Sequence, residues 1–333
     1  MIRKWRRMRQ ALLLLASTLL VPQAVIAAND VSVKSSRHFL DGEEPARTEF
    51  GKLIYLSGIT MHSDNPDFGG ISGLQISADG TRLLAVTDKG KWLSAHLIYE
   101  KDRLAGLDQV ELLALPGEDS RAISGEKKID SESLTLEQPG NLDGPVYVSF
   151  EGRRHRILYY PKGLSGKPTP VQMPAGLMLA PSNKGIEAFD RRADGSFIAL
   201  AEEYLDRDGN HTGWLVGKDR AHNIYLRREG EFSPTDLEFL PDGDLLVLER
   251  RYSLLGGPGM QIRRIRANTI KPDALLDGEV LINLTARYGI DNFEGLAVRV
   301  NAGGETIIYV VSDNNFNPLQ KNLLLMFKLS QRP

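Results

Sequence analysis

Short apolar strands and turns alternate along most of the chain. Five times, a small or acidic residue opens an apolar strand, a turn such as Asp-Gly or Gly-Gly follows, and a second apolar strand ends in a carboxylate. Because these turns supply the positive-φ residues that short hairpin loops need, each copy predicts a β-hairpin. Long helical periodicity is absent from the pattern, which disfavours mixed α/β folds. The predicted hairpins span residues 72–88, 132–151, 187–202, 235–249 and 294–313.

The spacing of these hairpins predicts the fold class. Their apolar anchor residues follow one another at intervals of 48 to 60 residues, and they are Leu74, Leu134, Phe189, Leu237 and Leu296. A hairpin unit repeated at this interval in an all-β chain is typical of a β-propeller with four-stranded blades. The chain length predicts six blades, with five or seven as alternatives. In the six-bladed arrangement residues 53–56 and 323–327 pair, so that the two chain ends complete one sheet and cover exposed strand edges.

The first 27 residues have a different pattern. Five basic residues lie within the first ten positions, an apolar run covers 11–20, and small residues follow at 25–28. This order is typical of a secretory signal peptide. Pro22 and Gln23 interrupt the apolar run before it reaches the roughly 20 residues that span a bilayer, which disfavours an uncleaved anchor. We therefore expect residues 1–27 to be a signal peptide and residues 28–333 to form one propeller domain, periplasmic or secreted, with the Sec and twin-arginine routes both open.

Composition removes several classes of function. The 41 basic and 43 acidic residues give a net charge of −2, so the charge gives no case for nucleic-acid binding. The absence of cysteine excludes disulfides, thiol catalysis and zinc-finger or iron–sulfur ligation. Without residues 1–27, 36 basic and 43 acidic residues remain, a net charge of −7, and no second apolar segment approaches spanning length. We expect an acidic monomer with no membrane span in the mature protein.

The ends of the predicted hairpins carry the candidate chemistry. In an antiparallel hairpin the first residue of one strand and the last residue of the other lie at the same open end. If the hairpins are the inner strands of successive blades, their acids gather on one face around the axis. Such a cluster repels itself unless a cation offsets it, and Ca²⁺ takes about six to eight oxygen ligands in flexible geometry. The predicted metal ligands are Asp88, Glu132, Glu151, Glu187, Glu202, Glu249, Glu294 and Asp313.

Basic residues follow several of these acids in the sequence. One alternative is that they only pair with the acids and hold loops together. They would also suit an anionic substrate, since guanidinium groups bind phosphate in a bidentate manner. His155 is the candidate acid or base, unless it lies on a solvated strand between arginines. The candidate substrate-binding residues are Lys89, Arg153, His155, Lys184 and Arg250, and no catalytic residue is assigned.

Five short segments carry a family resemblance, and they are residues 86–90 (VTDKG), 183–188 (NKGIEA), 246–250 (LVLER), 292–296 (NFEGL) and 311–316 (VSDNNF). With them, the chain from Gly69 to its C-terminus resembles the phytase-like family, the "esterase-like activity of phytase" proteins. The resemblance implies an exported bacterial propeller, and the family takes its name from phytases that use calcium to hold and hydrolyse phosphate esters. We therefore expect a Ca²⁺-dependent hydrolase of phosphate esters or related anionic esters, with its site where the predicted acids gather at one end of the propeller's central channel. The alternative is a non-catalytic propeller that binds a ligand or another protein of the cell envelope.

Overall fold

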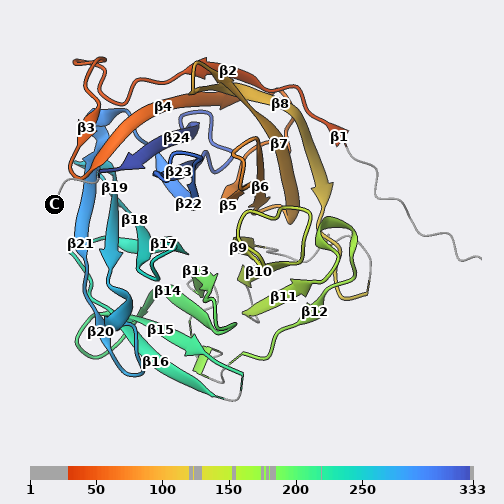
Figure 1. The fold of residues 1–333 in the computed structure, drawn as a ribbon, viewed down its shortest axis with the longest axis vertical. Helices are drawn as coiled ribbons and strands as arrows, with labels where there is room; N and C mark the ends of the chain where they lie inside the picture. Colours follow the sequence, from red (N-terminus) through yellow and green to blue (C-terminus); the bar gives the residue numbers. More distant parts are fainter. Residues whose placement is uncertain are drawn as a thin grey trace, which may run out of the picture.

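The strands surround a central axis as a ring of twisted sheets (Figure 1). The computed structural model describes residues 29–119, 123, 130–151, 155–173, 176–177, 180, 185–218 and 220–330. Within these ranges the strands form five sheets. The prediction of an all-β propeller is therefore confirmed, but the blade number is five and not six. The predicted signal peptide, residues 1–27, lies outside the described residues.

Each blade begins with its innermost strand and proceeds outward. Blade 1 contains β5 (Ile71–Ile76), β6 (Arg82–Thr87), β7 (Lys91–Glu100) and β8 (Arg103–Ala114), with β1 (Asn29–Asp30) at its edge. Blade 2 contains β9 (Asp130–Leu136), β10 (Val146–Glu151), β11 (Arg156–Tyr160) and β12 (Thr169–Pro170). Blade 3 contains β13 (Ile186–Arg191), β14 (Phe197–Leu205), β15 (His211–Val216) and β16 (Ala221–Leu226), and β20 (Leu275–Leu276) pairs with β16 in parallel.

The last two blades follow the same order. Blade 4 contains β17 (Ser233–Phe239), β18 (Leu245–Ser253), β19 (Gly257–Ile265) and β21 (Glu279–Thr285). Blade 5 contains β22 (Asn292–Val300), β23 (Thr306–Asp313), β24 (Asn322–Leu329), β4 (Leu53–His62) and β2 (Lys34–Arg37), and β3 (Glu49–Phe50) pairs with β4. The described helices are short 3₁₀ turns at Gly163–Ser165, Ala267–Thr269 and Ala286–Tyr288. No helix within the described ranges has the length and apolar character needed to cross a membrane.

Closure of the ring explains why the predicted blade number was wrong. The two chain ends do pair, as predicted, since β4 aligns with β24 from Leu53 opposite Leu329 to Met61 opposite Asn322. These strands, however, extend the sheet of the fifth hairpin, β22–β23, and do not form a sheet of their own. A hairpin needs only two further strands to complete a four-stranded blade, and the two chain ends supply them.

The innermost strands β5, β9, β13, β17 and β22 contact one another in a closed ring, and Figure 1 shows them nearest the axis. Their apolar anchors are all buried between neighbouring blades. Polar side chains from the same strands are also buried, and they meet across the axis. We call this group the axial layer, and it consists of Gln75, Ser133, Thr135, Asp190, Asp236 and Glu238.

Asp236 connects several blades of the axial layer through its carboxylate. Its carboxylate accepts hydrogen bonds from the Ser133 hydroxyl of blade 2 at 2.9 Å and from the Leu296 backbone N–H of blade 5 at 2.7 Å. The backbone N–H of Leu237 adds a third bond at 2.9 Å. One side chain therefore links three blades, and it is 2 % exposed.

Replacing Asp236 by alanine should lower the free energy of unfolding by about 3 kcal/mol, because the Leu296 N–H and the Ser133 hydroxyl lose a buried partner. Asp236→Asn should cost only about 1 kcal/mol, since its amide oxygen can accept from Leu296 and its NH₂ group can donate to Ser133. Urea unfolding of both variants measures the difference. Equal losses in the two variants would contradict a hydrogen-bonding role.

Candidate functional site

A β-bulge interrupts every inner strand at the same place. In blade 5, Phe293 aligns with Ser312 and Gly295 aligns with Val311, so Glu294 is the extra residue. A bulge bends the strand and re-aims the side chain that it carries. The equivalent bulge residues, two positions before each anchor, are Ser72, Glu132, Glu187, Thr235 and Glu294. The fold thus presents one re-aimed side chain from each blade at the open end of its hairpin.

The second strand of each hairpin supplies a further position at that end. In blade 4, Pro234 is the last residue before the bulge, and it aligns with Glu249, so the next residue on the second strand is Arg250. The same register in the other blades selects an acid each time. The five equivalent residues are Asp88, Glu151, Glu202, Arg250 and Asp313.

Seven of the eight predicted metal ligands therefore lie at one end of the axis, and Asp130 joins them. Carboxylate oxygens of Asp130, Glu132 and Glu151 all lie within 4.8 Å of one another. Asp130 was missed from the sequence, although it precedes Glu132 by two positions, and residues two apart on a strand share a face. We call the whole group the acidic mouth, and it consists of Asp88, Asp130, Glu132, Glu151, Glu187, Glu202, Glu294 and Asp313.

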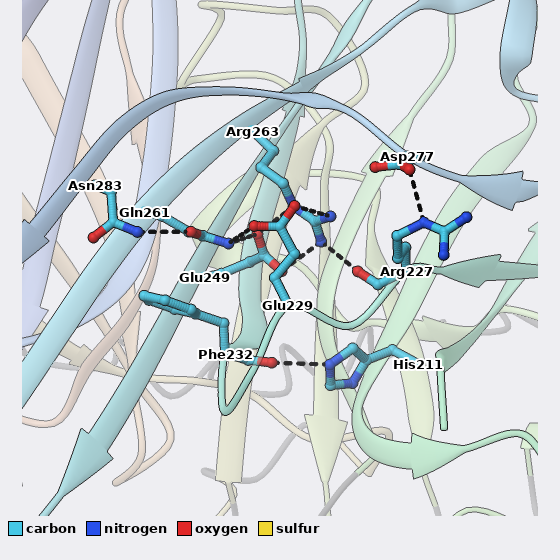
Figure 2. Close-up of polar contacts among 9 residues, drawn as sticks. All are labelled: His211, Arg227, Glu229, Phe232, Glu249, Gln261, Arg263, Asp277 and Asn283. Atoms are coloured by element: carbon cyan, nitrogen blue, oxygen red, sulfur yellow. Dashed lines mark hydrogen bonds and ion pairs between the residues drawn. The ribbon is translucent and has the colours of Figure 1, made fainter. Parts of the chain in front are cut away.

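Glu249 is the predicted ligand that the structure places elsewhere. Figure 2 shows its carboxylate between Gln261 and Arg263, which donate hydrogen bonds at 3.0 Å and 2.6 Å. Both Glu249 and Arg263 are fully buried, and the second carboxylate oxygen accepts another Arg263 bond at 2.6 Å. Adjacent residues in a strand point to opposite faces, so Arg250 takes the position at the mouth and Glu249 points between the strands of the blades. Its inclusion among the metal ligands was a register error of one residue.

Arg250 lies within the acidic mouth. Its guanidinium is 3.1 Å from Glu202 and 3.0 Å from Glu294, which come from blades 3 and 5. Burial alone would lower the pKa of Arg250, but the charges of Glu294 and Glu202 raise it further, so the group stays charged. Among the described residues, it is the one basic side chain with an ion pair to these acids.

The other predicted substrate-binding residues are placed differently. The Lys89 ammonium donates to the Pro66 carbonyl at 2.7 Å and lies over the Phe316 ring, so it does not pair with Asp88 beside it. His155 is buried, with Nε2 3.3 Å from the Ala180 carbonyl oxygen, and is not on a solvated strand. Arg153 and Lys184 lie outside the described residues.

Burial and like charges raise the pKa values of six carboxyl groups of the acidic mouth. Burial, followed by the charge of Asp313, raises the pKa of Asp88 to about 7. Burial is also the main cause of a pKa of about 7 for Glu151, Glu294 and Asp313. The pKa values of Glu132 and Glu187 are raised well above the usual range, again by burial first and by the neighbouring carboxylates second. The acidic mouth therefore gains stability from any bound proton or cation.

The donor set of the acidic mouth fits a hard divalent cation. Carboxylate oxygens are the ligands that Ca²⁺ and Mg²⁺ prefer, and Asp130, Glu132 and Glu151 bring three of them close together. Glu132 and Glu294 are partly exposed, so a cation from solvent can reach the group. The three-carboxylate cluster could bind a metal ion.

The fold and this site define a five-bladed propeller with a carboxylate-lined mouth. A family model described as "Phytase-like: Esterase-like activity of phytase" matches residues 66–316, a range that contains all five inner hairpins. The chain belongs to this phytase-like family. No curated protein matches the chain.

The raised pKa values predict how stability depends on pH in the absence of metal. A carboxyl with a raised folded-state pKa binds more protons in the folded protein, so its contribution to stability is lost as pH rises through that value. In chelator, the free energy of unfolding should therefore increase as pH falls from about 8 to about 6.5. Below this window the free energy of unfolding should decrease again, because the pKa values of His38 and His211 are lowered by burial and protonation of these histidines favours the unfolded chain.

Urea unfolding at several pH values in chelator measures this slope, and the same series in excess CaCl₂ is the comparison. Calcium should flatten the slope, because a bound cation takes over the role of the protons. Stability that stays constant or falls between pH 8 and 6.5 in chelator would contradict the assignment.

Proposed function

We propose that the acidic mouth binds Ca²⁺ and that the protein hydrolyses phosphate esters or related anionic esters there. The observation that supports this most strongly is the convergence of eight carboxyl groups from blades 1, 2, 3 and 5 at one end of the axis. Membership of the phytase-like family supports the same class of reaction. We also propose that the chain is exported, on the basis of the basic, apolar and small-residue order of residues 1–27.

Three groups of residues divide the work in this proposal. Asp130, Glu132 and Glu151 would hold the cation, which when bound polarises an ester oxygen and offsets developing negative charge. Arg250 presents a guanidinium that can orient an anionic ester group while Glu202 and Glu294 hold it in place.

Proton transfer is assigned to Asp88 and Asp313, which lie outside the three-carboxylate cluster. A carboxyl with a pKa of about 7 can take a proton from water during attack and return it to the leaving oxygen at neutral pH. The Ser72 hydroxyl donates to Asp88 at 2.7 Å, which fixes one carboxylate oxygen and leaves the other for this exchange.

Neutralising the metal ligands should weaken calcium binding and hydrolysis together. Glu132→Gln and Glu151→Gln should each reduce Ca²⁺ affinity by about tenfold, since each removes one carboxylate of the proposed ligand set. Calorimetric titration of chelator-treated protein with CaCl₂, followed by a panel of phosphate and carboxylic esters with and without chelator, measures both effects.

Glu249→Gln is the matched control for this experiment. It removes a buried acid of the same hairpin pattern but not of the mouth, so it should lower stability and leave Ca²⁺ affinity unchanged. Chelator-sensitive hydrolysis supports the enzyme, while stoichiometric calcium without hydrolysis would instead indicate a binding propeller. Absence of calcium binding would overturn the proposal.

Removing the charge of Arg250 should strengthen binding of the cation and weaken binding of the anionic substrate. Arg250→Gln should raise Ca²⁺ affinity by roughly tenfold, because it removes a positive charge beside the carboxylates. The same change should raise KM for an anionic ester more than it lowers kcat, because the guanidinium contributes to binding. Steady-state kinetics at saturating calcium separates the two parameters, and weaker calcium binding in this variant would refute the assigned position of Arg250.

A further inference from the structure

A cavity lies at the turn ends of the inner hairpins, on the other side of the axial layer from the acidic mouth. It has a volume of about 820 Å³, and residues from all five blades line it. We call it the turn-end cavity. Gln75, Thr135, Asp190 and Glu238 of the axial layer line it together with apolar side chains such as Leu136, Phe239 and Val298. The acidic mouth shares none of these residues.

Glu238 is a buried carboxyl group of this cavity with unused hydrogen-bonding capacity. It is only 8 % exposed. Its Oε2 accepts a hydrogen bond from the Gln75 amide at 2.7 Å, whereas Oε1 accepts none from the described residues. No lysine, arginine or histidine of the described chain forms an ion pair with it. A buried carboxyl in this condition lacks the partners that usually accompany burial.

The neighbouring acids differ from Glu238 in this respect. Asp190 accepts bonds from the backbone N–H groups of Arg191 at 2.6 Å and Phe239 at 2.8 Å, and from the Thr135 hydroxyl. Asp236 accepts three hydrogen bonds, from the Ser133 hydroxyl and from the backbone N–H groups of Leu237 and Leu296. Burial first, and the charges of Asp190 and Asp236 second, raise the pKa of Glu238 well above its usual range. A cation at this carboxyl would offset both effects.

The three arginines that line the cavity have their contacts away from Glu238. Arg192 lies 4.0 Å from the Asp194 carboxylate, and Arg299 Nε donates to the Tyr309 hydroxyl at 3.1 Å. Arg191 donates to the Glu137 carbonyl at 3.1 Å. The cavity therefore combines an apolar wall with a carboxyl that lacks a cationic donor.

We propose that the turn-end cavity binds a small organic amine, with its ammonium group donating to Glu238 and its apolar body against Leu136, Phe239 and Val298. A primary ammonium has three donors, which suits a carboxylate with a free oxygen. An α-amino acid suits the site poorly, because its own carboxylate would lie beside Glu238 and Asp190. The site does not depend on the proposed hydrolase activity.

Three probes with the same indole ring test the charge of the ligand. Tryptamine is cationic, tryptophol is neutral and tryptophan is zwitterionic at neutral pH. Titration calorimetry of the purified protein in excess CaCl₂ should show tryptamine binding at least about tenfold more tightly than the other two. Excess calcium limits binding of the amine to the acidic mouth. Equal affinity for tryptamine and tryptophol would overturn the proposal.

Two variants locate the binding. Glu238→Gln keeps the side-chain size and an acceptor for Gln75, and it should remove the preference for tryptamine. The matched control Asp194→Asn removes an exposed acid of the same cavity and should keep that preference. A preference that survives Glu238→Gln, or that is lost in Glu132→Gln of the acidic mouth, would refute the assigned site.

A further variant keeps the test decisive if Glu238→Gln fails to fold, which thermal unfolding monitors. Val298→Trp narrows the cavity without changing a charge, and Val298 is half-buried on β22. It should weaken tryptamine binding by about tenfold or more. Unchanged tryptamine affinity in Val298→Trp would show that the amine binds elsewhere.

Discussion

Hydrogen bonds across the axis hold the five blades in a fixed relation, and the carboxylates of Asp236 and Asp190 each accept two of them. The bonds of Asp236 to Ser133 and Leu296 join blades 2, 4 and 5, while the Gln75 amide joins blade 1 to Glu238 of blade 4. Such bonds need inner strands that approach closely, which a ring of five blades provides. The free energy of burying these polar groups is offset only when their partners are in place. The axial layer therefore favours one arrangement of the ring and separates its two ends.

The repeated β-bulge converts this ring into a site. Without the bulge, side chains would point to alternate faces of the strand in a regular order, and the residue two positions before each anchor would point to the same face as the anchor. With it, Glu132, Glu187 and Glu294 are re-aimed toward the end at which Asp88, Glu151, Glu202 and Asp313 also lie. Burial first, and repulsion by the neighbouring carboxylates second, raise the pKa values of Glu132 and Glu187, and a bound cation can relieve this unfavourable electrostatic energy. The bulges of blades 1 and 4 carry the uncharged residues Ser72 and Thr235. Most of the acids therefore come from blades 2, 3 and 5.

Much of this architecture could be predicted from the sequence, because Asp-Gly turns and alternating apolar positions are local signals. The hairpins, their anchors and seven of the mouth acids followed from such signals, and the pairing of the chain ends followed from the need to cover exposed strand edges. The blade number did not, since nothing local says whether terminal strands start a new sheet or extend an existing one. Whether Glu249 or Arg250 lies at the acidic mouth depends on the position of the bulge, which shifts the strand pairing by one residue. This position has no clear sequence pattern. The turn-end cavity and the unused oxygen of Glu238 depend on contacts between blades far apart in the chain.

The acidic mouth and the turn-end cavity are built from two different positions of the same repeated inner strand. Two residues before the anchor, the bulge directs side chains to the acidic mouth. One residue after each anchor, the strands of the first four blades contribute Gln75, Thr135, Asp190 and Glu238, and the fifth blade contributes Ala297. Thr135 pairs with Asp190, and Gln75 can give Glu238 only one bond. The methyl group of Ala297 has no donor, so the fifth blade offers no hydrogen bond from this position. The free carboxylate oxygen of Glu238 is thus a consequence of a five-membered ring in which one of the equivalent positions is apolar.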